Sequence, residues 1–121
     1  MKKVLIIDDV EGVRRSIEIG LSNAGYEVTT AGTYTEGFGL ATSQTFDIIL
    51  CDLKLPDKSG VEIIKNLKEN NIDTPVVAIS GFIDASMVKN AKAAGAVAYL
   101  PKPFLKGDLL MLMESIVPQE K

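Results

Sequence analysis

Short runs of β-branched residues alternate with amphipathic segments five times along this chain, and that alternation limits the fold more than any other feature. The runs are rich in Val and Ile and are bounded by turn-forming residues, which is typical of strands. They lie at residues 4–7, 27–31, 47–51, 75–80 and 98–100. A strand followed by a helix, repeated in this order, favours a parallel sheet with helices on both faces. The sequence therefore predicts an α/β fold with a doubly wound parallel sheet of five strands.

The segments between and after these runs carry helical patterns. They cover residues 12–24, 35–42, 61–70, 85–94 and 106–117. The last pattern is the clearest, because its large apolar residues recur at intervals of three and four and form one stripe. The stripe consists of Leu109, Leu112, Met113 and Ile116. The second pattern is the least certain to be helical, since Gly37 and Gly39 both disfavour a helix.

The size and charge of the chain suit a single domain. Its 121 residues are 46% hydrophobic, which is enough for one core and too little for two. We expect one domain over residues 1–121, in which residues 118–121 are either a tail or the start of a linker to an output domain. The formal net charge of −3 leaves no basic field for a nucleic-acid backbone. We therefore expect no direct nucleic-acid binding by this domain.

The chain contains no histidine. Its chemistry must then use carboxylates, lysine, hydroxyls and a metal, because Ser-His and Cys-His nucleophile pairs are excluded. Its one cysteine, Cys51, cannot form an internal disulfide and lies in an apolar run, where we expect a buried, inert thiol. Asp8 and Asp9 interrupt the first apolar run, unlike a secretory signal, and no apolar stretch is long enough to cross a bilayer. We expect a cytoplasmic protein that does not associate with membranes.

Reactive groups stand at the ends of four of the five expected strands. Asp8 and Asp9 follow the first run, Asp52 follows the third, Ser80 ends the fourth, and Lys102 comes shortly after the fifth. Open parallel sheets bind their ligands beyond the carboxyl ends of the strands. We therefore expect these side chains to converge at one edge of the sheet.

Three carboxylates at one edge would repel one another. At about 5 Å and an effective dielectric constant near 20, each pair costs roughly 3 kcal/mol. A hard cation such as Mg²⁺ relieves this repulsion and leaves positions for phosphate oxygens. Lys102 would add a fixed positive charge, Ser80 could donate to a phosphate oxygen, and an aspartate such as Asp52 can itself be the nucleophile. The set predicts metal-dependent phosphoryl transfer to an aspartate.

Four motifs carry a family resemblance. They are Val-Leu-Ile-Ile-Asp-Asp at residues 4–9, Ile-Ile-Leu-Cys-Asp-Leu-Lys-Leu-Pro at 48–56 with Gly60, Val-Ala-Ile-Ser-Gly at 77–81, and Ala-Tyr-Leu-Pro-Lys-Pro at 98–103. In this order and spacing the chain resembles the receiver domain of two-component response regulators, the CheY-like family. The resemblance covers nearly the whole chain. It implies a flavodoxin-like (βα)₅ fold with strand order 2-1-3-4-5.

The resemblance also implies partners and a reaction. A sensor histidine kinase or a histidine phosphotransfer protein would donate a phosphoryl group from its own histidine to Asp52. The domain would catalyse only its own phosphorylation and dephosphorylation, and it would not be a turnover enzyme. Asp9, Asp52 and the main-chain carbonyl of Lys54 would hold Mg²⁺, with Mn²⁺ as an alternative, and Asp8 would act through a bound water or by orienting its neighbour.

Further roles follow from the same resemblance. Lys102 would pair with the phosphoryl group, and its peptide bond to Pro103 would be cis. Ser80 and Tyr99 match the pair that switches on phosphorylation, in which the hydroxyl moves toward the phosphate and the ring turns inward. The surface of the fourth helix, fifth strand and fifth helix would then be the output face, and it could pair two copies as a homodimer. Neither Lys54 nor Phe82 can position a hydrolytic water, so we expect a comparatively long-lived phosphoryl group.

Three competing functions fit these residues less well. A nucleotide- or flavin-binding domain would need a glycine- or hydroxyl-rich loop after the first strand, where this chain has Asp-Asp-Val-Glu. A metal-dependent phosphatase with an aspartate nucleophile would need Asp-x-Asp there, but the two acids are adjacent. A degenerate receiver that acts only as an interaction module would not need the intact set of acids, hydroxyl and lysine.

Simpler structural roles are open for several single residues. Asp8 and Asp9 could cap a helix, Ser80 could cap the turn after it, and Tyr99 could merely pack its strand. Three further acids are interpreted as surface charges, although Glu11 is near the acidic pair: Glu11, Asp57 and Glu62.

Overall fold

The five apolar runs form one parallel sheet in the computed structural model, which describes residues 2–81 and 85–117. The strands are β1 (Lys3–Ile7), β2 (Glu27–Ala31), β3 (Ile48–Asp52), β4 (Val76–Ser80) and β5 (Ala98–Pro101). They are arranged in the order β2-β1-β3-β4-β5, and every neighbouring pair is parallel. This confirms the predicted fold and strand order.

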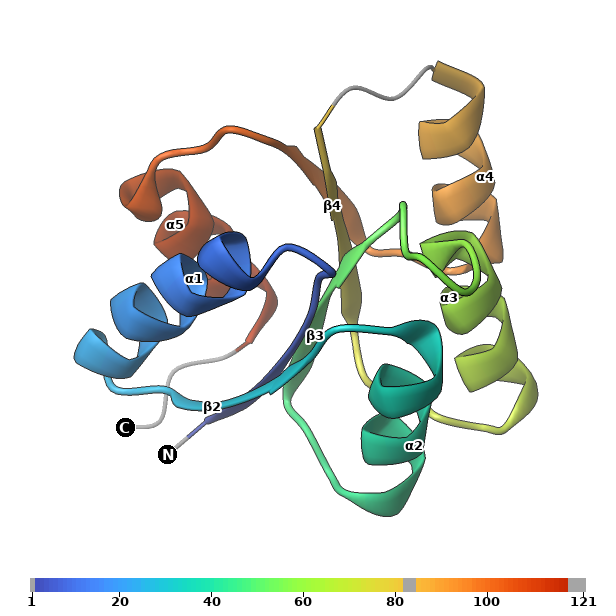
Figure 1. The fold of residues 1–121 in the computed structure, drawn as a ribbon, viewed down its shortest axis with the longest axis horizontal. Coiled ribbons are helices and arrows are strands. Elements are labelled where there is room, and N and C mark those ends of the chain that lie inside the picture. The colour runs from blue at the N-terminus through green and yellow to red at the C-terminus, as the bar shows by residue number, and fades with distance from the viewer. Residues whose placement is uncertain (1, 82–84, 118–121) are drawn as a thin grey trace.

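Five helices cover the two faces of the sheet (Figure 1). They are α1 (Glu11–Asn23), α2 (Tyr34–Ser43), α3 (Gly60–Glu69), α4 (Ala85–Ala94) and α5 (Lys106–Ile116). Helices α1 and α5 lie on one face, and α2, α3 and α4 lie on the other. The ends of all ten predicted elements agree with the observed ends to within one residue.

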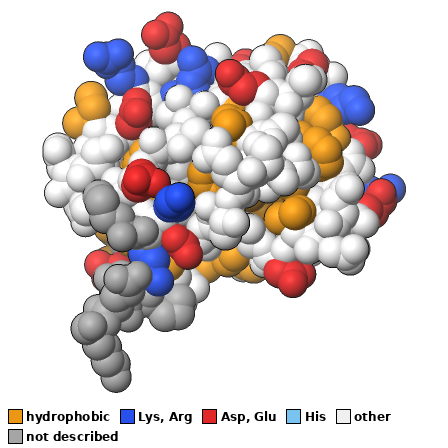
Figure 2. Space-filling model, turned by 90° about the horizontal axis from the view of Figure 1, so that it is seen from below, with side chains coloured by type: hydrophobic (Ala, Val, Ile, Leu, Met, Phe, Trp, Pro, Cys, Tyr) orange, Lys and Arg blue, Asp and Glu red, His pale blue; other side chains and the backbone are white. Residues whose placement is uncertain are grey.

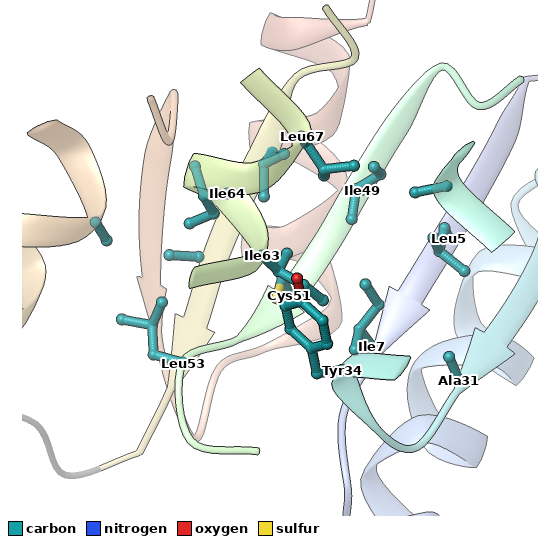
Figure 3. Close-up of a cluster of buried hydrophobic side chains, with 14 of the residues drawn as sticks. Leu5, Ile7, Ala31, Tyr34, Ile49, Cys51, Leu53, Ile63, Ile64 and Leu67 are labelled. Atoms are coloured by element: carbon teal, nitrogen blue, oxygen red, sulfur yellow. The ribbon is translucent and has the colours of Figure 1, made fainter. Parts of the chain in front are cut away.

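The core has two halves, because successive residues of a strand point to opposite faces of the sheet. Leu5 and Ile7 of β1 pack with Ile63 and Ile64 of α3 on one face (Figure 3). The intervening strand residues pack with α1 and α5 on the other face, where Leu109 and Met113 supply the stripe predicted from the sequence. Burying each Leu or Ile side chain contributes about 1.5–3 kcal/mol, so both halves anchor the sheet firmly.

Helix α2 forms although it contains two glycines. Its N-cap residue Thr33 accepts from the Glu36 amide at 3.1 Å, and the Glu36 side chain accepts from the amide of Gly32, just before the cap, at 2.7 Å. A side chain at Gly37 would collide with Ile7, since an added Cβ would lie 2.6 Å from the Ile7 Cδ1 atom. Gly37 therefore permits close packing of the helix on β1, which outweighs its low helix propensity.

The surface shows no region of one charge on the face drawn in Figure 2, where acidic and basic side chains are interspersed. The hydrophobic side chains on this face form small, separate groups. None of the helices in the described part of the chain combines the length and the apolar character that a membrane span requires.

Candidate functional site

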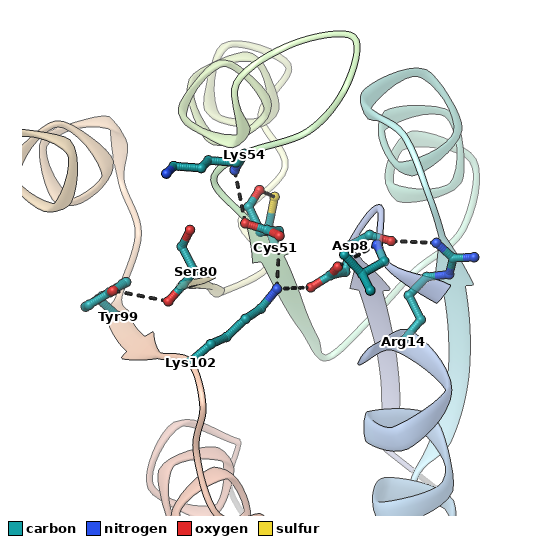
Figure 4. Close-up of polar contacts among 9 residues, drawn as sticks. Asp8, Arg14, Cys51, Lys54, Ser80, Tyr99 and Lys102 are labelled. Atoms are coloured by element: carbon teal, nitrogen blue, oxygen red, sulfur yellow. Dashed lines mark hydrogen bonds and ion pairs between the residues drawn. The ribbon is translucent and has the colours of Figure 1, made fainter. Parts of the chain in front are cut away.

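The carboxyl edge of the sheet gathers side chains from four strands (Figure 4). Asp52 is the last residue of β3 and Ser80 the last of β4, whereas Asp8 follows β1 and Lys102 follows β5. Because β1, β3, β4 and β5 are consecutive in the sheet, these side chains leave it side by side. Residues that lie between 22 and 94 positions apart in the chain are thus brought to one site, as the sequence predicts.

Lys102 bridges two buried carboxylates at the centre of this edge. Its Nζ lies 2.5 Å from Asp8 Oδ2 and 3.0 Å from Asp52 Oδ2. The Asp8 side chain is 0% exposed and that of Asp52 is 7% exposed. The ammonium group therefore neutralises charge that would otherwise be buried without a partner.

Burial has opposite effects on the pKa values of Asp8 and Lys102. Burial raises the pKa of Asp8, although the hydrogen bonds from Lys102 and from the Val10 amide oppose the rise. Burial would lower the pKa of Lys102, but its hydrogen bonds to Asp8 and Asp52 and their negative charges raise it overall. Lys102 therefore stays protonated and keeps its positive charge at the site.

Asp8 also fixes the backbone around it. Its Oδ1 accepts from the Val10 amide at 2.9 Å in the turn that leads into α1. No side chain caps the helix at its N-cap residue Val10, so the simpler capping role considered for Asp8 is not observed. Its carbonyl oxygen accepts from Arg14 at 2.7 Å (Figure 4). Nothing in the sequence distinguishes Arg14 from its neighbour Arg15, so this contact could not be predicted.

Three carboxylates are close enough to share one cation. One oxygen from each of Asp8, Asp9 and Asp52 lies within 4.8 Å of the others. Asp9 is exposed whereas the other two are buried, so the cluster borders solvent at Asp9. An all-oxygen set that keeps contact with water suits Mg²⁺, which retains several of its waters when bound. The residues present therefore fit a divalent cation.

A short loop continues from Asp52, and we call residues 53–59 the acceptor loop. The Lys54 amide donates to Asp52 Oδ1 at 3.0 Å, so both carboxylate oxygens of Asp52 are held. A Cβ on Gly60 would collide with the main-chain oxygen of Asp52. Glycine is thus required where α3 begins, which gives a physical reason for its place in the sequence motif.

Ser80 is the last residue of β4, and Tyr99 lies within the neighbouring strand β5. Ser80 is 1% exposed. The Tyr99 hydroxyl donates to the carbonyl oxygen of Ser80 at 3.3 Å (Figure 4). The peptide bond between Lys102 and Pro103 is cis, as the resemblance implied. Phe82, to which the expected phosphoryl lifetime refers, lies outside the described residues.

Asp57 has a role that the sequence does not reveal. It is exposed, as expected of a surface charge, but its carboxylate accepts hydrogen bonds from Tyr34 and Thr35 at the start of α2. The hydrogen bond from the Tyr34 amide, with those from Thr35, holds the pKa of Asp57 below its usual range. A proline and an acid in a loop are compatible with many turns, so this contact across the sheet edge could not be predicted.

Comparisons with known proteins agree with this geometry. The sequence profile of the response regulator receiver domain matches residues 4–114. The cell cycle transcriptional regulator CtrA of Caulobacter vibrioides is 33% identical over 119 residues, which cover 98% of this chain and 52% of CtrA. The cell cycle response regulator CtrA of Brucella ovis is 34% identical and 51% covered. This chain thus spans about half the length of these curated relatives.

Solved structures of receiver domains superpose closely on this fold. The chemotaxis protein CheY4 of Vibrio cholerae superposes with a TM-score of 0.90 at 31% identity, covering 96% of this chain and 98% of CheY4. A CheY-like receiver domain protein of Methanospirillum hungatei superposes with a TM-score of 0.92 at 30% identity, covering 95% of this chain and 92% of its own.

Proposed function

Since this chain belongs to the response regulator receiver domain family, we propose that it accepts a phosphoryl group on Asp52 from the histidine of a sensor kinase or phosphotransfer protein. The observation that carries the proposal is the buried Asp52 carboxylate, held by Lys102 and the Lys54 amide beside Asp8 and Asp9. A nucleophile placed among fixed donors needs little reorganisation when the phosphoryl group arrives.

The reaction exchanges one bond to phosphorus for another. A carboxylate oxygen of Asp52 forms the new P–O bond as the P–N bond of the phosphohistidine breaks, and the electron pair of that bond stays on the imidazole nitrogen. Lys102 already lies 3.0 Å from Asp52, so its ammonium can move onto a phosphoryl oxygen without leaving the site. Ser80, also at this edge, would donate a hydrogen bond from its hydroxyl group to another phosphoryl oxygen.

Mg²⁺ bound to Asp9, Asp52 and the main-chain carbonyl of Lys54 would supply positive charge to the phosphoryl oxygens, with Asp8 acting beside it through water. The chain itself holds carboxylate oxygens of Asp8, Asp9 and Asp52 within 4.8 Å of one another. The charge repulsion among these three carboxylates favours the binding of a cation. Mn²⁺ has the same preference for oxygen ligands and would substitute.

The donor protein has a surface to contact next to the site. Val13 and Ile17 of α1 and Pro103 and Phe104 after β5 line an apolar hollow that reaches Lys102. A protein that brings its histidine to Asp52 must cover this rim, and apolar contacts there would be buried on docking.

The modification would change the output surface formed by α4, β5 and α5. Tyr99 of β5 donates to the Ser80 carbonyl, so movement of Ser80 toward a phosphate would alter that hydrogen bond and bias the position of the ring. Met111 of α5 is 72% exposed, and Val97, in the connection just before β5, is 52% exposed. This apolar area suits an output partner or a second copy of the chain. The domain would act as a switch without turning over a small substrate.

Incubation with Mg²⁺ and acetyl phosphate tests the proposal. Intact-mass measurement should show the addition of one phosphoryl group to the protein and none to Asp52→Asn. Omission of Mg²⁺, with EDTA present, should prevent the addition. Equal addition to both proteins, or none to either, would refute the assignment of Asp52.

A further inference from the structure

The acceptor loop is tied across the sheet edge to the beginning of α2. Asp57 lies in the acceptor loop, five residues after Asp52, and its carboxylate lies over the first turn of α2. Its Oδ1 accepts from the Tyr34 amide at 2.8 Å, and its Oδ2 accepts from the Thr35 amide at 3.2 Å and from the Thr35 hydroxyl at 3.1 Å. A carboxylate at a helix N-terminus also interacts favourably with the partial positive charge there.

A second contact joins the same two segments. The Lys58 ammonium lies 4.7 Å above the centre of the Tyr34 ring. Such a cation–π contact at an exposed position adds a modest attraction. Two consecutive loop residues, Asp57 and Lys58, thus contact the first two residues of α2.

The acceptor loop is closed at its base. The Gly60 amide donates to the Leu53 carbonyl at 2.9 Å, and Lys54 forms an antiparallel bridge with Ser59. A loop closed in this way transmits a displacement of its tip to its base, where Lys54 lies. Lys54 is the residue whose amide holds Asp52 and whose carbonyl would face the metal.

We propose that Asp57 is a positioning residue for metal-dependent phosphorylation: by fastening the acceptor loop to the first turn of α2, it holds the main chain of Lys54 at the metal site. This inference rests on the proposed function. Without the tie, the loop would have to be ordered when the metal binds, and that loss of freedom would weaken the affinity for the metal. Groups that orient ligands from outside the coordination sphere commonly change metal affinity by about 10–100-fold. Because this tie is exposed, we expect a smaller effect, about three- to tenfold.

The coupling must act in both directions, because it is a difference in free energy between two sites. If Asp57 helps the metal to bind, then the metal should help Asp57 to hold α2. Exchange of the Tyr34 and Thr35 amide hydrogens should therefore slow when Mg²⁺ is added. This readout does not depend on phosphorylation.

The test compares Asp57→Ala with a matched variant at the other end of the sheet. Asp47 also accepts a main-chain hydrogen bond across loops, from the Lys3 amide at 2.7 Å, but it is remote from the site. Calorimetric titration should show the dissociation constant for Mg²⁺ raised about three- to tenfold in Asp57→Ala and unchanged in Asp47→Ala. Phosphorylation by acetyl phosphate should slow at limiting Mg²⁺ and recover at saturating Mg²⁺. Equal dissociation constants in Asp57→Ala and the parent would overturn the inference.

A double-mutant cycle separates the tie from the charge of Asp57. Thr35→Val removes one donor to Asp57 without changing any charge, and we expect a smaller rise in the dissociation constant. Combined with Asp57→Ala it should add nothing, whereas full additivity would contradict a shared contact. The parent protein tests the premise separately: if it binds no Mg²⁺, the proposed metal site is wrong, whereas Mg²⁺ binding that Asp57→Ala leaves intact refutes only the role of Asp57.

Discussion

Lys102 is the residue on which the electrostatics of the site depend. It is the positive partner of Asp8 and Asp52, and it holds both at hydrogen-bonding distance from the end of β5. Removal of one member of a buried ion pair leaves the other charge without compensation, which is far more damaging than loss of a surface pair. The lysine thus serves the stability of the resting domain as well as the proposed chemistry.

We expect Lys102→Met to lower the free energy of unfolding by about 2–4 kcal/mol in EDTA, because two buried carboxylates lose their counter-charge. Urea denaturation followed by circular dichroism measures this change. Added Mg²⁺ should restore part of the loss, since a cation among the carboxylates replaces the ammonium. The exposed Lys65→Met serves as the control and should change little. A Lys102 variant as stable as the control would show that the ion pairs contribute nothing.

The pKa of Asp57 gives a prediction about acid. Because its folded-state pKa lies below the ordinary value of 3.8, its ionised form stabilises the fold above that value. The contribution is lost as the pH falls through the lowered pKa, where the carboxyl group is protonated in both states. Urea midpoints of the parent should therefore exceed those of Asp57→Asn near neutral pH, and the two should converge as the pH falls below 3.8. A difference that grows on acidification would contradict the direction of the shift.

At the scale of elements, glycines decide how closely helices approach the sheet. Gly60 begins α3 where an added Cβ would meet the Asp52 carbonyl oxygen, so α3 can start directly against the strand that carries the acceptor. Gly39 lies in α2 with no atom within 4 Å of an added Cβ. An added Cβ would therefore meet the backbone at Gly60 and open space at Gly39.

A matched pair of substitutions tests this difference. Gly60→Ala should lower the free energy of unfolding by about 1–3 kcal/mol, because the backbone must shift to admit the methyl group, and it should slow phosphorylation by displacing Asp52. Gly39→Ala should raise the free energy of unfolding by about 0.5–1 kcal/mol, since alanine favours a helix. Thermal and urea unfolding measure both changes. Similar effects of the two substitutions would show that Gly60 is not a close-contact position.

The elements themselves were predictable from the sequence, whereas several contacts between them were not. Alternation of β-branched runs with amphipathic segments depends on local chemistry, which is why all ten elements agree with the predictions. The edge that gathers Asp8, Asp52, Ser80 and Lys102 followed from the parallel order of the strands. The pairing of Lys102 with Asp8 depends on side-chain conformations at the ends of distant strands. The hydrogen bonds from Tyr34 and Thr35 to Asp57 depend on the path of the acceptor loop across the sheet edge. The periodicity of the sequence carries no information about that path.

At the scale of the whole molecule, a metal bound at the proposed site would couple folding stability to ligand binding. Repulsion among Asp8, Asp9 and Asp52 opposes folding, so the domain carries unfavourable charge that a cation would relieve. This chain spans about half the length of its curated relatives. Under the proposed function, a metal and a phosphoryl group would shift the balance between two states of the domain.

This coupling predicts that Mg²⁺ raises the stability of the domain and that Asp9 is needed for the effect. A ligand that binds only the folded state stabilises it by about 2.7 kcal/mol when present at 100 times its dissociation constant. Removing one of three clustered negative charges should instead stabilise the metal-free protein, so Asp9→Asn should have the higher urea midpoint in EDTA. In saturating Mg²⁺ the order should reverse, because only the parent gains from binding. Asp47→Asn, remote from the cluster, should respond to Mg²⁺ as the parent does. If the midpoint of the parent does not move with Mg²⁺, the three carboxylates are not a metal site, and Lys102 is the cation that balances their charge.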